Sequence, residues 1–324
     1  MQSSPKPNAQ NSPRPPPRSS IFRIMQKAIL HELDVTERLL RSNLGGSIFV
    51  FLGGLLAPLL RAASPSLPVA IEATLQILAV GFICSYAFEI CNQTTSPEED
   101  AVNKPYRPIP AGLLTIRQAR FRWFLSWLLS PLALYHFHGA WAATHMLEFE
   151  ALVAFCYVWP RWFSWFMRNL FVSLIYLIQA RILNVVLGAT VSDWNLSLYI
   201  DLAVSAWAMG TVHVQEFHDL EGDRKSDRKT LPMLLSPRGL RLLRAGTSIY
   251  MVAFGAALAL AGFQKMNRVN ILIGPMSALQ LTASVTLAYK VWASTGPEMD
   301  KATFYHWYYI PVFMILLSLP LVIE

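Results

Sequence analysis

Two short segments of the chain combine carboxylates with basic side chains directly after apolar stretches. The first acidic segment, residues 92–112 (NQTTSPEEDAVNKPYRPIPAG), places an amide and carboxylates ahead of Lys104 and Arg107. The second acidic segment, residues 216–225, reads EFHDLEGDRK. Carboxylates bind hard cations such as Mg²⁺, and Lys and Arg bind phosphate oxygens. The two segments therefore predict one metal–diphosphate site built from two halves.

The candidate metal ligands lie in both segments. In the first, Asn92 offers an amide oxygen and Asp100 a carboxylate. In the second, Glu216, Asp219 and Asp223 are three and four residues apart, a spacing that lines up one face of a helix end. Mg²⁺ prefers one or two carboxylates together with waters and phosphate oxygens, so this set suffices for a Mg²⁺ cofactor. We expect the three aspartates to be catalytic.

Basic side chains in the same segments are expected to bind the diphosphate. Together with the metal they would stabilise the negative charge that develops on the leaving group. One such loop alone would more simply be a solvated surface loop, but two matched loops favour a site. The candidates are Lys104, Arg107, Arg224 and Lys225.

Apolar segments of spanning length must position these loops. The chain has 324 residues, of which 54% are hydrophobic and 15% charged, and its mean hydropathy is +0.37, too apolar for a soluble domain. Because period-2 alternation is absent, we expect an all-α membrane protein rather than a β-barrel. Nine transmembrane helices of ~20 residues are predicted, at 43–62, 68–91, 118–137, 139–158, 168–190, 196–216, 239–262, 269–292 and 303–323.

The distribution of Lys and Arg predicts the orientation. These residues are concentrated before the first span and after the second, fourth and sixth spans. The positive-inside rule therefore places the N-terminus, both acidic segments and the mouth of a central cavity in the cytosol. The net charge of +7 reflects this asymmetry and contact with anionic lipid, not nucleic acid. We expect a multi-pass protein of the endoplasmic reticulum with no obligate protein partner.

The chain divides into three predicted parts. Residues 1–20 are rich in Pro and Ser and are expected to be disordered. Residues 21–42 alternate apolar and charged positions, as expected of an amphipathic helix at the membrane interface. Residues 43–324 form the transmembrane catalytic domain. The cysteines, Cys84, Cys91 and Cys156, form no CxxC pair and are expected to be buried free thiols.

Polar residues inside the fifth predicted span are further candidates. A charge in the bilayer costs roughly 2.5–3.5 kcal/mol on the insertion scale, so Arg181 must face a partner or a wet cavity. We expect the partner to be the diphosphate, with Asn184 nearby. Arg168, at the start of the span, is expected to reach the same cavity or, alternatively, to anchor the span at the membrane interface. The alternative is a structural pair between Arg181 and a buried acid, namely Glu148, Glu150 or Asp201.

Aromatic side chains would stabilise a carbocation by cation–π attraction without attacking it. Tyr176 and Trp207 are the predicted cavity aromatics and are expected to take part in catalysis. Trp162, Trp165 and the cluster at 304–309 are instead expected in the aromatic belt at the membrane interface.

The chain resembles the UbiA-type intramembrane prenyltransferases over about residues 43–323. That family carries an Asn, Asp at the fourth and eighth positions after it, then Lys-Pro-x-Arg-Pro and a Gly. A second pattern, Asp-x-x-Asp-x-x-Gly-Asp-Arg, is matched by residues 216–224, and the run at 180–188 resembles the Arg…Asn…Gly run of plant-type members. In the first pattern the matching residues are Asn92, Asp100, Lys104, Pro105, Arg107, Pro108 and Gly112.

The departures from these patterns resemble a fungal branch that cyclises its substrate. Ser96 stands where the family has Asp, and Glu216 replaces another Asp. The resemblance implies a UbiA-type bundle and a Mg²⁺-dependent terpene cyclase that ionises a prenyl diphosphate, farnesyl diphosphate in that branch, and yields a sesquiterpene. Two alternatives remain. A prenyltransferase with an aromatic or other acceptor would share the same diphosphate site, and a secondary transporter would use intramembrane charges without paired acidic loops.

Overall fold

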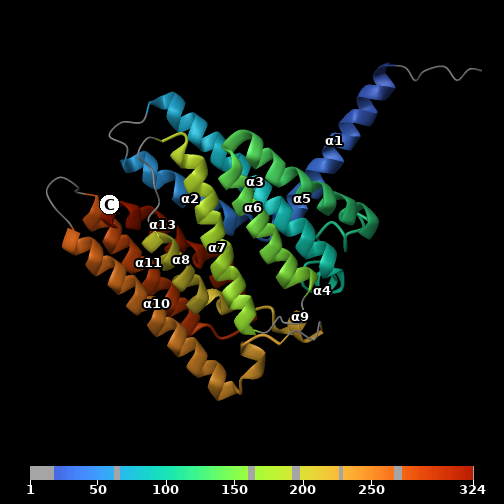
Figure 1. Cartoon of the computed structure of the whole chain (residues 1–324). Helices are drawn as coiled ribbons and strands as arrows, with labels where there is room; N and C mark the ends of the chain where they lie inside the picture. Colours follow the sequence, from blue (N-terminus) through green and yellow to red (C-terminus); the bar gives the residue numbers. More distant parts are fainter. Residues whose placement is uncertain are drawn as a thin grey trace, which may run out of the picture.

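The computed structural model describes residues 18–61, 66–159, 165–191, 198–225, 229–265 and 272–323, which form helices joined by turns and loops, with no strand among them. Long helices pack side by side in a bundle, and α1 projects away from it (Figure 1). The helices are α1 (Arg18–Leu40), α2 (Leu44–Arg61), α3 (Leu67–Thr95), α4 (Pro97–Asn103), α5 (Ile116–His138), α6 (Ala140–Val153), α7 (Trp165–Gly188), α8 (Leu198–Thr211), α9 (Leu220–Lys225), α10 (Pro237–Lys265), α11 (Ile273–Ala293), α12 (Pro297–Trp307) and α13 (Tyr309–Ile323).

Local sequence signals set several helix ends. Thr115 caps α5 in a capping box with Gln118, whose side chain accepts from the Thr115 backbone N–H. Prolines occupy the first turn of α3, α4 and α12, where their missing N–H has no partner to lose. The short helices α4 and α9 lie at one end of the bundle (Figure 1).

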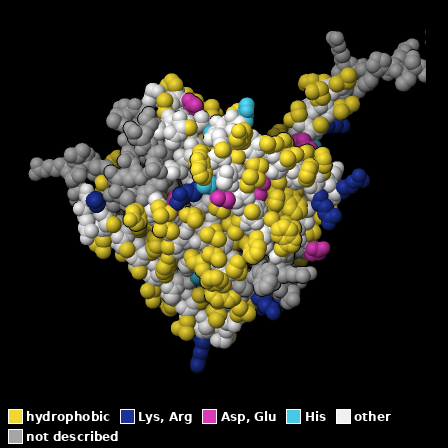
Figure 2. Space-filling model, viewed as in Figure 1, with side chains coloured by type: hydrophobic (Ala, Val, Ile, Leu, Met, Phe, Trp, Pro, Cys, Tyr) yellow, Lys and Arg dark blue, Asp and Glu magenta, His cyan; other side chains and the backbone are white. Residues whose placement is uncertain are grey.

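The bundle core is apolar and is formed mainly by helix pairs. α10 packs against α11, α13 against α2, α7 against α8, and α5 against α6. All three cysteines are buried and free, as predicted. Figure 2 shows hydrophobic side chains over most of the face viewed, with few charged ones between them. Such a surface is typical of a protein that is covered by lipid.

Each of the nine predicted spans overlaps helix in the described part of the chain. Four stretches are long and apolar enough to cross a membrane by length and composition: 67–95, 165–188, 237–265 and 297–320. The last of these consists of α12 and α13 together. This finding agrees with the prediction of an integral membrane protein. The count of nine crossings and their direction remain predictions.

The N-terminal helix α1 covers most of the segment 21–42 that was expected to be amphipathic. Its apolar residues up to Leu33, such as Phe22 and Met25, are exposed, whereas Val35 and Leu39 are buried against the bundle. Its location at a membrane interface remains a prediction, and residues 1–17 of the predicted disordered tail lie outside the described residues.

Candidate active site

The structure brings the two acidic segments together. In the first segment α4 follows α3 after Ser96, and in the second α9 follows a 3₁₀ turn at 212–217; α4 packs against α9 (Figure 1). The electrostatics agree with this contact. Burial and Arg107 lower the pKa of Lys104, whereas Asp219, Asp100 and Glu89 act in the opposite direction. A lysine of the first segment therefore lies within the field of an aspartate of the second.

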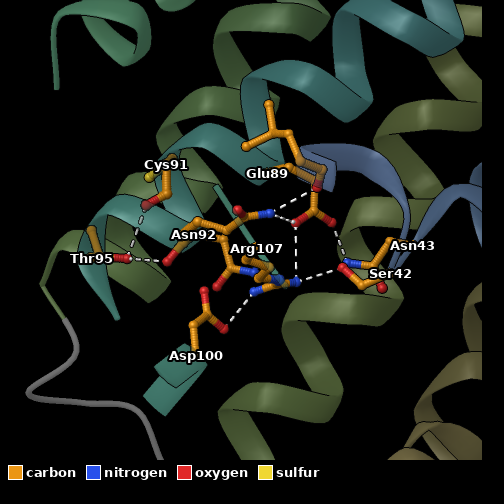
Figure 3. Close-up of polar contacts among 10 residues, drawn as sticks. Ser42, Asn43, Glu89, Cys91, Asn92, Thr95, Asp100 and Arg107 are labelled. Carbon is orange, nitrogen blue, oxygen red and sulfur yellow. Dashed lines mark hydrogen bonds and ion pairs between the residues drawn. The ribbon is translucent and has the colours of Figure 1, made fainter. Parts of the chain in front are cut away.

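Arg107 of the first segment is held in a buried charge network (Figure 3). Its Nη1 donates to Asp100 Oδ1 at 2.7 Å, and its Nη2 donates to Ser42 Oγ at 2.6 Å and to Glu89 Oε2 at 3.3 Å. Glu89 also accepts from Asn43 Nδ2 and, at 3.1 Å, from Gln93 Nε2. The Arg107 and Glu89 side chains are only 2% and 1% exposed. Two carboxylates thus already balance a cation that the sequence assigned to the diphosphate.

The backbone of the first segment holds this arrangement. Asp100 N donates to Ser96 O at 3.2 Å, and Lys104 N donates to Asp100 O at 2.8 Å, so the short helix α4 connects Ser96 to Lys104. The turn after Arg107 ends at Gly112, whose φ of 75° lies in the left-handed region that favours glycine. The glycine of the pattern therefore has a conformational role.

Asp100 retains one oxygen that fits a metal ion. Its Oδ2 is buried and has no hydrogen-bond partner among the described residues, while Oδ1 binds Arg107. Burial raises the pKa of Asp100, although Arg107 and Lys104 act in the opposite direction. A buried carboxylate oxygen without a partner is costly unless a cation neutralises it, so the donor set is compatible with Mg²⁺.

The second segment is not one continuous α-helix, contrary to the prediction. Glu216 lies in the 3₁₀ turn 212–217, and Asp223 lies in α9 after a break at His218. The three carboxylates instead converge through tertiary packing on Arg168 of α7. The Arg168 Nε is 3.3 Å from Glu216 Oε1, and the charges of Asp223 and Asp219 also act on its guanidinium.

Other residues of the second segment are less enclosed. The His218 Nε2 lies 3.5 Å from Asp219 Oδ1, and burial lowers the pKa of His218. Arg224 is exposed at the surface of α9, and the side chain of Lys225 lies outside the described residues. Among the residues described, no three His, Cys, Asp or Glu side chains converge closely enough to hold a metal without other ligands. Phosphate oxygens and water would have to complete the coordination.

A cavity leads from this polar end into the bundle. Glu89 and Arg168 line its polar end, and Tyr176, Phe88, Phe171 and Tyr157 are among the aromatics that line its walls. The Phe88 ring meets the Tyr157 ring edge to face, with ring centroids 5.5 Å apart, and the Tyr157 and Phe171 centroids are 5.3 Å apart. Tyr176 is eight residues beyond Arg168 on α7, about 12 Å along the helix.

The structure differs from the predictions for Trp207 and for the cluster at 304–309. Trp207 is fully buried and packs against Phe254 of α10, and it is not among the lining residues of the cavity. The cluster at 304–309 does not sit only at the membrane interface, because Phe304 and Tyr308 are buried and line the cavity. In both cases the rotation of the helix about its axis decides whether an aromatic side chain faces the cavity, and the amino-acid type does not reveal that rotation. Trp162 lies outside the described residues.

Arg181 binds a carboxylate of the protein instead of facing the acidic segments. Its Nε lies 2.7 Å from Asp201 Oδ2 of α8, which is the structural pair left open by the sequence. Arg181 and Asn184 are 13 and 16 residues beyond Arg168 on α7, which corresponds to about 20 and 24 Å along the helix. We therefore leave both residues out of the diphosphate site.

Glu89, Ser42 and Asn43 belong to the network around Arg107 and were not predicted from the sequence. Glu89 offered a signal, because it is an acidic residue inside the second predicted span, where an ionisable group marks a functional site by default. Ser42 and Asn43 carry no such signal, since polar residues are ordinary at a junction between two helices. Asn92, a predicted metal ligand, lies in the last turns of α3 close to this network (Figure 3).

Comparisons with known proteins agree with this architecture. A model of the UbiA prenyltransferase family matches residues 47–315. The chain is 32% identical over 233 residues to the diterpene cyclase eriG of Hericium erinaceus, covering 69% of each chain. It is 27% identical over 242 residues to the polyprenyl transferase eriF of the same organism, covering 72% of this chain and 76% of that protein. The solved structure of a UbiA homolog from Archaeoglobus fulgidus bound to DMAPP and Mg²⁺ superposes with a TM-score of 0.59 at 16% identity, covering 88% of this chain and 99% of that one.

Proposed function

The chain belongs to the UbiA prenyltransferase family, and we propose that it is a membrane-bound terpene cyclase that ionises farnesyl diphosphate and cyclises it to a sesquiterpene. Its similarity to named terpene cyclases and prenyltransferases supports an enzyme rather than a transporter. The similarity to eriG favours cyclisation, and Ser96 in place of an Asp fits the cyclase branch that the sequence resembles.

The observation that carries the proposal is the aromatic-walled cavity that begins at the paired carboxylates and cations. Arg168 lies at the polar end with Nη1 unpaired among the residues described, so it offers a donor to a diphosphate oxygen. The walls carry Phe88, Phe171 and Tyr176, whose faces attract a cation without bonding to it. Charge therefore separates along one axis, with the diphosphate at the cations and the carbocation among the aromatics.

The proposed reaction breaks the bond between C1 and the diphosphate oxygen, and the electron pair leaves with the diphosphate. Arg168 and Lys104 offset the charge that develops on that leaving group. The electron pair of a distant double bond in the same chain then forms the new carbon–carbon bond. Loss of a proton from a carbon next to the final cation to a base or to the released diphosphate gives a neutral hydrocarbon. The apolar walls exclude water, which would otherwise form an alcohol.

Mg²⁺ is the proposed cofactor, and the solved homolog with bound Mg²⁺ and DMAPP supports it. The Asp100 Oδ2 in the first segment, with Asn92 nearby, and Glu216, Asp219 and Asp223 in the second are the residues that would hold it. When bound, Mg²⁺ supplies Lewis-acid stabilisation of the departing diphosphate. From the distribution of Lys and Arg, we propose that this site faces the cytosol. We also propose that the protein resides in the endoplasmic reticulum.

The test is incubation of the purified full-length protein with Mg²⁺ and geranyl, farnesyl or geranylgeranyl diphosphate, without an acceptor. We expect steady release of diphosphate and a cyclic C15 hydrocarbon in the headspace from farnesyl diphosphate. Preference for geranylgeranyl diphosphate would correct the chain length only, in the direction of the relative eriG. Turnover that begins only after an aromatic acceptor is added, with a prenylated product, would show that the transferase alternative, supported by eriF, is correct.

A further inference from the structure

Two side chains at the junction of α1 and α2 enter the buried network around Arg107. Ser42 and Asn43 lie between α1 and α2, ahead of the residues 47–315 that match the family. Both side chains nevertheless enter the buried network of the first segment (Figure 3). Ser42 Oγ accepts from Arg107 Nη2 at 2.6 Å, and Asn43 Nδ2 donates to Glu89.

Backbone and side-chain contacts fix this junction against the first segment. Gln93 Nε2 donates to Leu39 O at 2.8 Å, and Arg38 Nη1 donates to Tyr106 O at 3.3 Å. The Arg41 guanidinium lies over the ring of Tyr106, with its Cζ 5.2 Å from the ring centroid. The end of α1 is therefore attached to α3 through Gln93 and to the residue before Arg107 through Tyr106. Ser42 Oγ cannot move away from Arg107 without breaking several of these contacts.

The network has a charge pattern that depends on these two side chains. Arg107 faces two carboxylates, Glu89 and Asp100, and its position decides which of the two it neutralises. Asn43 Nδ2 and Gln93 Nε2 donate to Glu89 and satisfy it in part, while Ser42 Oγ holds the second guanidinium nitrogen. Without these contacts, Arg107 is free to turn toward Glu89 and release Asp100 Oδ1. Asp100 would then present an uncompensated negative charge, which repels the diphosphate.

We propose that Ser42 and Asn43 are positioning residues of the diphosphate site, and that α1 is part of the catalytic unit as well as a membrane-surface helix. They act through Arg107 and Glu89, which set the charge and orientation of Asp100. The inference rests on the metal–diphosphate site of the proposed function. It does not depend on the fate of the prenyl cation, because a cyclase and a transferase share that site.

The experiment compares variants of the full-length protein in detergent or nanodiscs. Ser42→Ala removes only a hydroxyl group, and Ser42→Thr keeps it. Asn43→Asp replaces the donor by a carboxylate of the same size beside Glu89. Glu37→Gln is the control for the attachment of α1, because Glu37 lies in that helix and makes an exposed pair with Arg41.

Two readouts separate positioning from folding. The first is thermal stabilisation of the protein by farnesyl diphosphate with and without Mg²⁺, which needs no turnover. The second is the KM for the prenyl diphosphate, the Mg²⁺ concentration at half activity, and kcat. A hydrogen bond to a charged group changes an equilibrium by roughly tenfold or more. We expect Ser42→Ala to raise the KM for prenyl diphosphate roughly tenfold, and Asn43→Asp to raise it more, with the hydrocarbon product unchanged.

Ser42→Thr and Glu37→Gln should behave like the wild-type protein. The inference is overturned when folded Ser42→Ala binds prenyl diphosphate and Mg²⁺ like the wild type, whatever the result for Asn43→Asp. It is also overturned when Glu37→Gln weakens binding equally, since α1 would then act only by general attachment. A wild-type protein that binds the diphosphate but needs an acceptor for turnover would refute the cyclase and leave this inference standing on the binding data.

Discussion

Replacement of Arg181 by Leu tests whether this arginine belongs to the fold or to the reaction. In the structure its Nε binds Asp201 Oδ2 at 2.7 Å, and it lies about 20 Å beyond Arg168 along α7. We therefore expect Arg181→Leu to lower the stability of the protein and to leave the KM for prenyl diphosphate unchanged.

The magnitude follows from the burial of the pair. Removing one partner of a buried ion pair costs ~3–5 kcal/mol, because the other charge is left uncompensated. The side chain of Asp201 is 2% exposed, but that of Arg181 is 40% exposed, so the cost should lie at the lower end, about 3 kcal/mol. Replacing both residues by Leu removes both charges, and that change is often neutral or stabilising. The double variant Arg181→Leu/Asp201→Leu should therefore recover most of the lost stability.

The assay is unfolding of the purified protein in mixed micelles, paired with diphosphate release under saturating and limiting substrate. Arg168→Gln is the matched comparison on the same helix, and it should raise the KM at least tenfold, because it removes a charge-assisted contact to the diphosphate. The reasoning is refuted when Arg181→Leu raises the KM without loss of stability, or when the stable double variant has lost binding of the diphosphate. Either outcome would place Arg181 within reach of the substrate.

Three further predictions concern acidic side chains and Ser96. Asp100→Ala, Asp219→Ala and EDTA should each abolish diphosphate release while the protein stays folded; full turnover in EDTA would exclude a metal-dependent site. Ser96→Ala should cost far less activity than Asp100→Ala, because the hydroxyl carries no charge, and equal losses would make Ser96 a ligand or a structural cap. Glu150 is 6% exposed, and its Oε1 has no hydrogen-bond partner in the described structure. Glu150→Gln should therefore raise the free energy of unfolding by about 1 kcal/mol or more, whereas Glu148→Gln, at an exposed position, should change it by less than about 0.5 kcal/mol. A loss of stability in Glu150→Gln would show that the carboxylate has a partner.

Much of the fold was determined by the sequence. Apolar stretches of spanning length become helices because a bilayer leaves no other partner for backbone N–H and C=O groups, and each of the nine predicted spans overlaps a helix in the described chain. The positions of the acidic segments follow as well, since charged residues at the ends of apolar stretches must lie outside the apolar core. The free buried cysteines and the family resemblance also follow from the order of the residues alone.

Only the tertiary structure decided which charge meets which. Arg107 binds Glu89 and Asp100, and Arg181 binds Asp201, because residues from different helices are brought together by packing. Trp207 faces α10 and not the cavity for the same reason. In an α-helix each residue turns the side-chain direction by about 100°, so the rotation and depth of every helix relative to its neighbours must be known before a partner can be assigned. A single sequence states the type of each side chain, and the packing of the helices determines what that side chain touches.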